Sequence, residues 1–162
     1  MPRLPRALIA VSVLLFAVAV LLPAAYYIDG PRSGLDMLVV GWIGPILHHF
    51  GWYANPLLLT SWILGLSRKP RRAEIRVRLG YVALAVACTS FVSLPLCDMP
   101  RKDGMVSADF MGLGPAIFVW LAAFVLDMVS ARKGLEALRA ETMTLPPRAG
   151  ASAAGRTPGD RT

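Results

Sequence analysis

The stretch that decides the fold is RKPRRAEIRVR, residues 68–78, which lies between two long apolar segments of a 162-residue chain. It holds six of the seventeen Lys and Arg residues. A cluster of this charge cannot lie in the hydrocarbon of a bilayer at acceptable free energy. The apolar segments on its two sides are therefore expected to be separate elements that both end at a water-exposed surface.

Outward from this basic stretch, four apolar segments are each close to the length of about 20 residues that a helix needs to cross a bilayer. They cover residues 7–28, 49–67, 79–97 and 110–131. They are too long, and alternate too little, for the strands of a membrane barrel. The chain is also 56% hydrophobic, above the usual range for soluble proteins. We therefore predict an all-α, membrane-embedded four-helix bundle over residues 1–143.

The cations are distributed unevenly between the connections. Fourteen of the seventeen lie at the N-terminus, in the 67–78 connection or in the C-terminal tail, whereas the other two connections hold three cations and five aspartates. By the positive-inside rule, both termini and the 67–78 connection face the cytoplasm. Residues 144–162, rich in Pro, Gly and Ala, are predicted to form a disordered cytoplasmic tail.

The net charge of +7 would suggest a nucleic-acid partner in a soluble protein. Here the cations lie where the membrane topology requires them, so we expect no nucleic-acid partner. Cations next to a membrane attract anionic lipid headgroups instead. The lipid bilayer is therefore the first expected partner.

The first apolar segment also resembles a signal peptide, because Arg3 and Arg6 precede its apolar core. That core, residues 7–22, is slightly longer than a typical signal-peptide core, and Pro23 spoils the small-residue pattern of a cleavage site. We therefore expect an uncleaved first span.

The region from 37 to 67 contains no charged residue and is too long for one simple crossing. Ser33 and Asp36 have the spacing of a capping box, which predicts a short helix starting there. Gly44-Pro45 would end that helix. We expect it to lie at the outer interface, helped by Trp42, or to tuck between the other helices. The alternative is one long tilted span.

Asn55 and Pro56 occur inside the second apolar segment. A helix starting there would be too short to cross, so we expect the helix to begin between His48 and Trp52 and to be kinked at Pro56. The Asn55 amide would then bind the backbone or a neighbouring helix. The alternative is an unwound turn that coordinates a polar ligand.

Small residues at helical spacing predict two packing faces. One face contains Gly80, Ala83, Ala87 and Ser90, and the other contains Gly112, Ala116 and Ala123. Asp127 lies on the second face, about 40° around the helix from Ala123. We expect Asp127 to point into the bundle and to be held by Arg132 or by a cation of residues 68–78. The alternative is a proton or cation relay.

His48 and His49 are adjacent near the predicted outer boundary. Neighbouring side chains on a helix diverge by about 100°, so the two cannot bind both faces of one haem. A surface metal or quinone-headgroup site is the alternative to ordinary interfacial histidines. We expect no catalytic residue, metal or cofactor, and hence no enzyme.

The residues Gly41-Trp42, followed by WYANPLL at 52–58 and then the basic stretch, resemble small uncharacterised bacterial inner-membrane proteins with four predicted spans. This resemblance implies a bacterial cytoplasmic membrane but no activity. We expect a non-enzymatic accessory, structural or interaction protein that contacts a protein partner or a second copy of itself. The alternative is a subunit of a small oligomeric transporter or channel.

Overall fold

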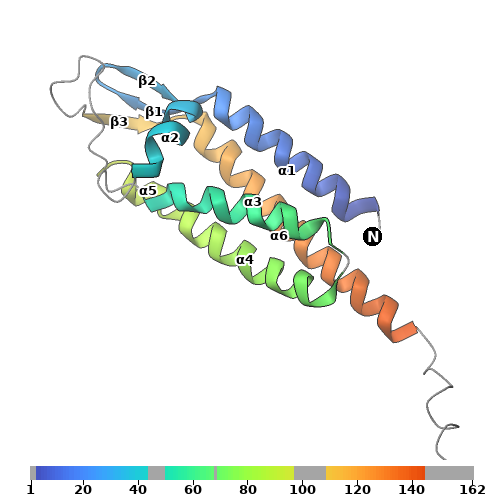
Figure 1. Ribbon diagram of the computed structural model, residues 1–162. Coiled ribbons are helices and arrows are strands. Elements are labelled where there is room, and N and C mark those ends of the chain that lie inside the picture. The colour runs from blue at the N-terminus through green and yellow to red at the C-terminus, as the bar shows by residue number, and fades with distance from the viewer. Residues whose placement is uncertain (1–2, 44–49, 68, 97–108, 145–162) are drawn as a thin grey trace, which may run out of the picture.

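The computed structural model describes residues 3–43, 50–67, 69–96 and 109–144. Four helices form an elongated bundle (Figure 1), and they are α1 (Arg3–Leu21), α3 (Ala54–Gly65), α4 (Pro70–Cys88) and α6 (Pro115–Thr144). Helix α1 packs along α6, α3 packs along α4, and α4 packs against α6. The predicted helical bundle is therefore present, although α3 is shorter than the other three helices.

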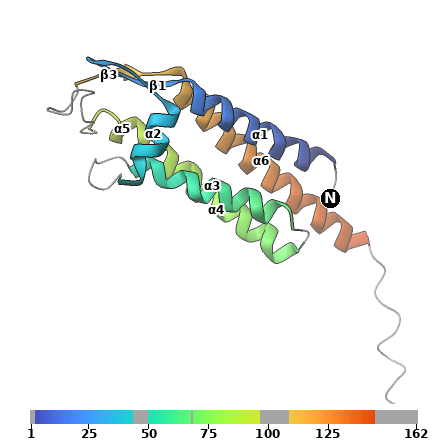
Figure 2. The ribbon, with the colours of Figure 1, turned by 45° about the horizontal axis from the view of Figure 1, so that its top comes forward.

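The remaining elements gather at the end of the bundle opposite the N-terminus (Figure 2). They are β1 (Pro23–Tyr27), β2 (Gly30–Ser33), α2 (Gly34–Val40), the 3-10 turns η1 (Gly41–Ile43) and η2 (Phe50–Tyr53), α5 (Ser90–Ser93) and β3 (Phe110–Leu113). The prediction of an all-α fold is wrong at this end, which we call the sheet end. The opposite end is called the basic end, because it carries the α3–α4 connection and both ends of the described chain.

The three strands form an antiparallel sheet in the order β2-β1-β3. Strands β1 and β2 make a tight hairpin in which Tyr27 pairs with Gly30. Gly30 has a φ of 118°, a conformation that residues with a Cβ rarely adopt. Pro31 has no N–H to donate. It is tolerated in β2 because an edge strand has a neighbouring strand on one side only, so not every N–H needs a partner in the sheet. The central strand β1 follows α1 in the chain and pairs with β3, which precedes α6. This pairing therefore links the end of α1 to the start of α6.

The predicted segment boundaries need correction at the sheet end. Helix α1 ends at Leu21 and not at 28, because Pro23 cannot continue a helix and the residues after it pair in the sheet. Likewise, residues 110–113 form β3, so the last helix begins at Pro115, and proline suits the first helical position. That helix then runs past 131 to Thr144.

The third predicted segment, 79–97, corresponds to a helix that begins and ends about nine residues earlier in the chain. Helix α4 starts at Pro70 and ends at Cys88, before a turn at Thr89 and the short α5. Most of the basic stretch is therefore helical and is not a loop. The face predicted from small residues is confirmed, since Gly80, Ala83, Ala87 and Ser90 are all buried. On the second face, Ala116 and Ala123 are buried, but Gly112 belongs to β3.

The second predicted segment, 49–67, divides into η2 and α3, and the expected kink at Pro56 is wrong. Helix α3 begins at Ala54, so Pro56 lies in its first turn, where the N–H groups have no acceptor within the helix. The capping box of Ser33 and Asp36 is confirmed at the start of α2. Two elements therefore replace one long tilted span, whereas Gly44-Pro45 lies outside the described residues.

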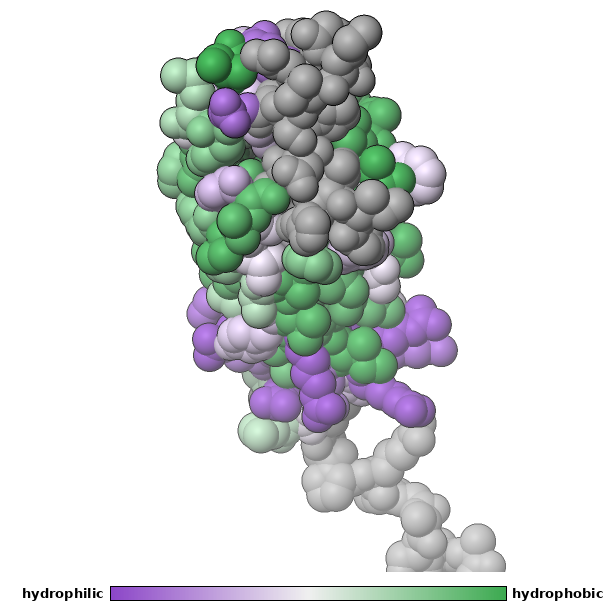
Figure 3. Space-filling model, turned by 90° about the vertical axis from the view of Figure 1, so that its left-hand side faces the viewer, coloured by the Kyte–Doolittle hydropathy of each residue, from purple (hydrophilic) through white to green (hydrophobic). Residues whose placement is uncertain are grey.

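Within the described residues, three helical stretches are long and apolar enough to cross a membrane, and they are Leu4–Leu21, Pro70–Ser93 and Pro115–Met143. Apolar side chains on the flanks of the bundle are exposed, for example Leu14, Ile63 and Phe118. On the face shown in Figure 3, hydrophilic residues gather toward the basic end, below a hydrophobic belt. Such a belt suits contact with lipid hydrocarbon.

Candidate functional site

A buried ion pair lies in the basic half of the bundle. Arg76 of α4 donates from Nη2 to Oδ1 of Asp127 on α6, at 2.5 Å. Their side chains are only 3% and 1% exposed. The prediction that a cation of residues 68–78 would hold Asp127 is confirmed, and the other candidate, Arg132, is exposed.

Two serines extend this pair into a network that joins four helices. The Ser61 hydroxyl of α3 donates to Oδ2 of Asp127 and accepts a longer contact of 3.4 Å from Arg76 Nε. The Ser130 hydroxyl accepts from Arg76 Nη2 at 3.2 Å and donates to the carbonyl of Pro5 on α1 at 2.8 Å. We call Ser61, Arg76, Asp127 and Ser130 the ionic network.

The helices leave space for the Arg76 side chain. A Cβ on Gly65 of α3 would lie 2.9 Å from Arg76 Cζ, so a larger residue there would have to displace the guanidinium. Both oxygens of the Asp127 carboxylate accept hydrogen bonds within the network. A buried charge is expensive unless it is paired in this way. This arrangement suits a structural tie between helices better than a site that exchanges ions with solvent.

A second polar contact lies further along the bundle. The Ser12 hydroxyl of α1 donates to the carbonyl of Ala123 at 2.7 Å and accepts from Trp62 Nε1 of α3 at 3.2 Å. Phe16 packs edge-to-face on Trp62, with ring centroids 5.6 Å apart. Helix α1, whose outer face is apolar, is thus held to α3 and α6 by a buried hydroxyl.

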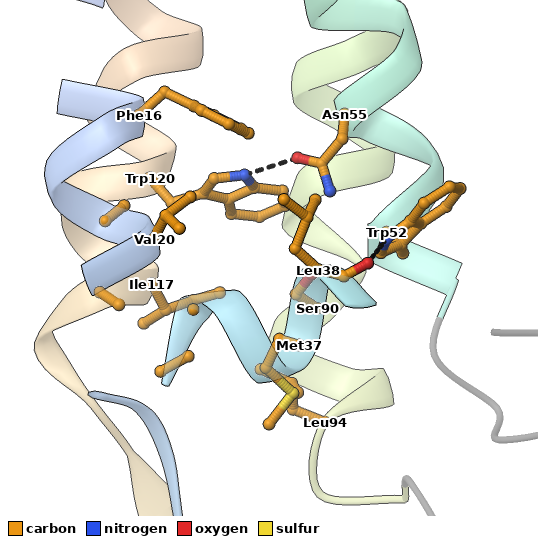
Figure 4. Close-up of a pocket in the computed structure, with 14 residues that line it drawn as sticks. Phe16, Val20, Met37, Leu38, Trp52, Asn55, Ser90, Leu94, Ile117 and Trp120 are labelled. Carbon is orange, nitrogen blue, oxygen red and sulfur yellow. Dashed lines mark hydrogen bonds between the residues drawn. The ribbon is translucent and has the colours of Figure 1, made fainter. Parts of the chain in front are cut away.

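Asn55 lies near the sheet end, at the start of α3. Its Oδ1 accepts a hydrogen bond of 2.8 Å from Trp120 Nε1 on α6, as Figure 4 shows. The side chain is buried, so the predicted role of the Asn55 amide in joining helices is confirmed. Because an amide oxygen accepts and an amide nitrogen donates, this contact leaves the Asn55 N–H₂ group as a donor.

A cavity of about 60 Å³ lies beside Asn55, between α1, α2, the start of α3, α5 and α6 (Figure 4). Its walls are mostly apolar, with aromatic rings from Phe16, Trp52 and Trp120. Trp52 Nε1 donates to the carbonyl of Leu38 at 2.8 Å and thereby ties the cavity wall to α2. Ser90 also lines the cavity, and its hydroxyl is fully buried with no hydrogen-bond partner among the described residues.

No protein-family model, curated protein or solved structure matches this chain.

His48 and His49 lie outside the described residues, so the structure does not place them. Within the described ranges, no group of three or more His, Cys, Asp or Glu side chains could hold a metal ion. Of the four polar candidates predicted from the sequence, Asp127 and Asn55 are described, and they belong to different clusters. Asp127 belongs to the ionic network, and Asn55 lines the cavity.

Arg76 was among the candidate cations of residues 68–78, but it was not singled out from the sequence as the partner of Asp127. Arg76 lies one turn before Gly80 and two turns before Ala83, so it shares their buried face. That spacing is a signal that could have found it. Ser61 could have been found in the same way, since it shares a face with Leu58 and Gly65.

Proposed function

We propose that this chain is a multi-pass integral membrane protein of the bacterial cytoplasmic membrane that acts as a non-enzymatic accessory protein through helix contacts and its sheet end. The observation that carries the proposal is the ionic network. It uses the buried charges of α4 and α6 to hold helices together, with both carboxylate oxygens and the guanidinium already bound.

We propose four crossings, and the course of the chain supports this number. The N-terminus, the α3–α4 connection and the end of α6 lie at the basic end, so α1, α3, α4 and α6 each run between the two ends (Figure 1). Helix α3 alone, with 12 residues, is about 18 Å long. The four residues of η2 precede it directly and add about 8 Å, which brings the segment close to a bilayer thickness.

The positive-inside rule then places the basic end in the cytoplasm. We expect a cysteine at Arg72, exposed at the basic end, and one at Pro31, exposed on β2, to react from opposite sides of the membrane. The measurement is labelling of Arg72→Cys and Pro31→Cys with an impermeant maleimide in spheroplasts and in inverted vesicles, with Cys88 and Cys97 replaced by serine. Labelling of both positions from the same side would contradict the four-crossing topology.

An accessory role requires a protein partner, and the sheet end offers a folded surface for one. Strands β2 and β3 are the edges of the sheet, and their outer backbone groups are available for contacts. We expect native mass spectrometry of the detergent-extracted protein to show a complex with a different polypeptide. The matched control is Arg76→Met with Asp127→Leu, which changes the bundle interior and leaves the sheet end intact.

The alternative function is a subunit of a small transporter or channel. It predicts a native mass spectrum without a complex with a different polypeptide. A discrete homo-oligomer without a second polypeptide would favour that function and contradict the accessory role. The ionic network argues against a path through one copy, because its charged groups bind each other across the bundle. A conduit would therefore have to form between copies.

A further inference from the structure

We infer that the cavity at the sheet end binds the ester carbonyl and the adjoining acyl segment of a membrane glycerolipid. This inference rests on the proposed membrane insertion but not on the accessory role. The two groups that would bind the carbonyl are the Ser90 hydroxyl and the Asn55 amide nitrogen, which belong to two residues that line the cavity (Figure 4).

The polar groups of the cavity favour a ligand that accepts hydrogen bonds. The Ser90 hydroxyl is fully buried and has no partner among the described residues, which is costly for a hydroxyl. Asn55 Oδ1 already accepts a hydrogen bond from Trp120, and the Asn55 amide nitrogen adds a second donor beside Ser90. A carbonyl oxygen has two lone pairs and can accept from both donors.

The remaining lining residues favour a ligand that is uncharged and mostly apolar. No charged side chain is among its lining residues, so nothing there would compensate a phosphate or a carboxylate. Alkyl and aromatic groups form the remaining walls, and they favour hydrocarbon. The ligand is therefore an apolar molecule with an uncharged oxygen acceptor.

The size of the cavity favours a chain over a ring. Its volume is about 60 Å³, whereas a cavity that admits benzene measures about 150 Å³. A quinone ring is larger than benzene, so a cavity of this volume disfavours it. The ester carbonyl and the first methylene groups of an acyl chain are smaller than such a ring, so this segment fits the cavity while the headgroup and the rest of the lipid stay in the bilayer.

The position of the cavity fits the depth of lipid ester groups. Asn55 is the second residue of α3, Ser90 follows the end of α4, and Trp120 lies in the second turn of α6, so all three lie near the helix ends at the sheet end. Tryptophans concentrate at the same level of a membrane, between headgroups and hydrocarbon. The ester carbonyls of a glycerolipid lie in that layer too.

The test compares two lipids that differ only in their carbonyls. Dioleoyl phosphatidylglycerol and its dioleyl ether analogue are each added to protein in dodecyl maltoside, a detergent without a carbonyl, and the thermal midpoint Tm is followed by tryptophan fluorescence. We expect the ester lipid to raise the Tm of the wild type by about 2–4 °C more than the ether lipid, the shift that one net hydrogen bond gives in a chain of this size.

Ser90→Ala removes the donor without adding volume, and we expect it to abolish the preference for the ester lipid. Ser93→Ala is the matched control, because Ser93 is also buried without a partner among the described residues but does not line the cavity. That variant should keep the full preference. In native mass spectra, we expect one retained phosphatidylglycerol in the wild type and in Ser93→Ala, and less in Ser90→Ala.

Several results would overturn the inference. These are equal Tm shifts from the two lipids in the wild type, a preference for the ester lipid that persists in Ser90→Ala, and a larger shift from decylubiquinone than from the ester lipid. A loss of stability in Ser90→Ala that does not depend on lipid would indicate bound water only. None of these results affects the sidedness measured by labelling, so failure of the lipid site and failure of the membrane topology are distinguishable.

Discussion

Asp127→Asn is expected to lower the free energy of unfolding by about 3–5 kcal/mol, because it leaves the buried Arg76 guanidinium without its counter-charge. The asparagine can still accept a hydrogen bond from Ser61, so the loss reports mainly the unpaired charge. The measurement is unfolding of the protein in mixed micelles with increasing dodecyl sulfate, followed by tryptophan fluorescence. We also expect the yield of folded protein to fall more than for any other single acidic substitution.

The control for this change is Glu136→Gln on the same helix. Glu136 is 59% exposed and forms an ion pair with the exposed Lys133 at 3.3 Å, so its removal should alter stability by less than about 0.5 kcal/mol. The double variant Arg76→Met with Asp127→Leu tests the physical reason. Replacing both charges by apolar side chains of similar size should restore most of the lost stability. Wild-type stability in Asp127→Asn would show that the pair does not hold the bundle together.

Gly114→Ala is expected to produce the second large effect, because Gly114 joins the sheet to α6 without room for a side chain. A Cβ there would lie 2.2 Å from the carbonyl oxygen of Pro23, which is a backbone atom. The Gly114 N–H also donates to the carbonyl of Ala24 at 2.8 Å, so the two segments cannot separate without losing this bond. We expect a loss of about 1–3 kcal/mol or more in the same unfolding measurement.

Gly112→Ala is the matched control, because Gly112 lies in the neighbouring strand β3 and a Cβ there meets no atom within 4 Å. Replacing glycine by alanine in extended backbone reduces the entropy of the unfolded chain, so this variant should be neutral or slightly more stable than the wild type. Equal stability of the two variants would indicate that α6 can move relative to β1, and that the sheet is only loosely attached to the bundle.

Two local sequence signals predict parts of the sheet end, and they are a capping box and a hairpin turn. The capping box at Ser33 was recognised, and it forms. The Asp29-Gly30 pair is a strong hairpin signal that was passed over, because the apolar residues before it were assigned to a span. The pairing of β1 with β3 had no such signal. It joins segments on either side of the whole α2–α5 region, and it depends on how α1 and α6 pack.

The sequence by itself determined the apolar segments, the basic end, the short helix at Ser33, and the need of Asp127 for a nearby cation. These properties follow from composition, helical spacing and local capping, which act over a few residues. Only the tertiary structure decided that this cation is Arg76, that Trp120 binds Asn55, and that Ser90 faces a cavity. Such contacts join residues far apart in the chain, and their free energy depends on the burial and close packing that exist only once the helices are assembled.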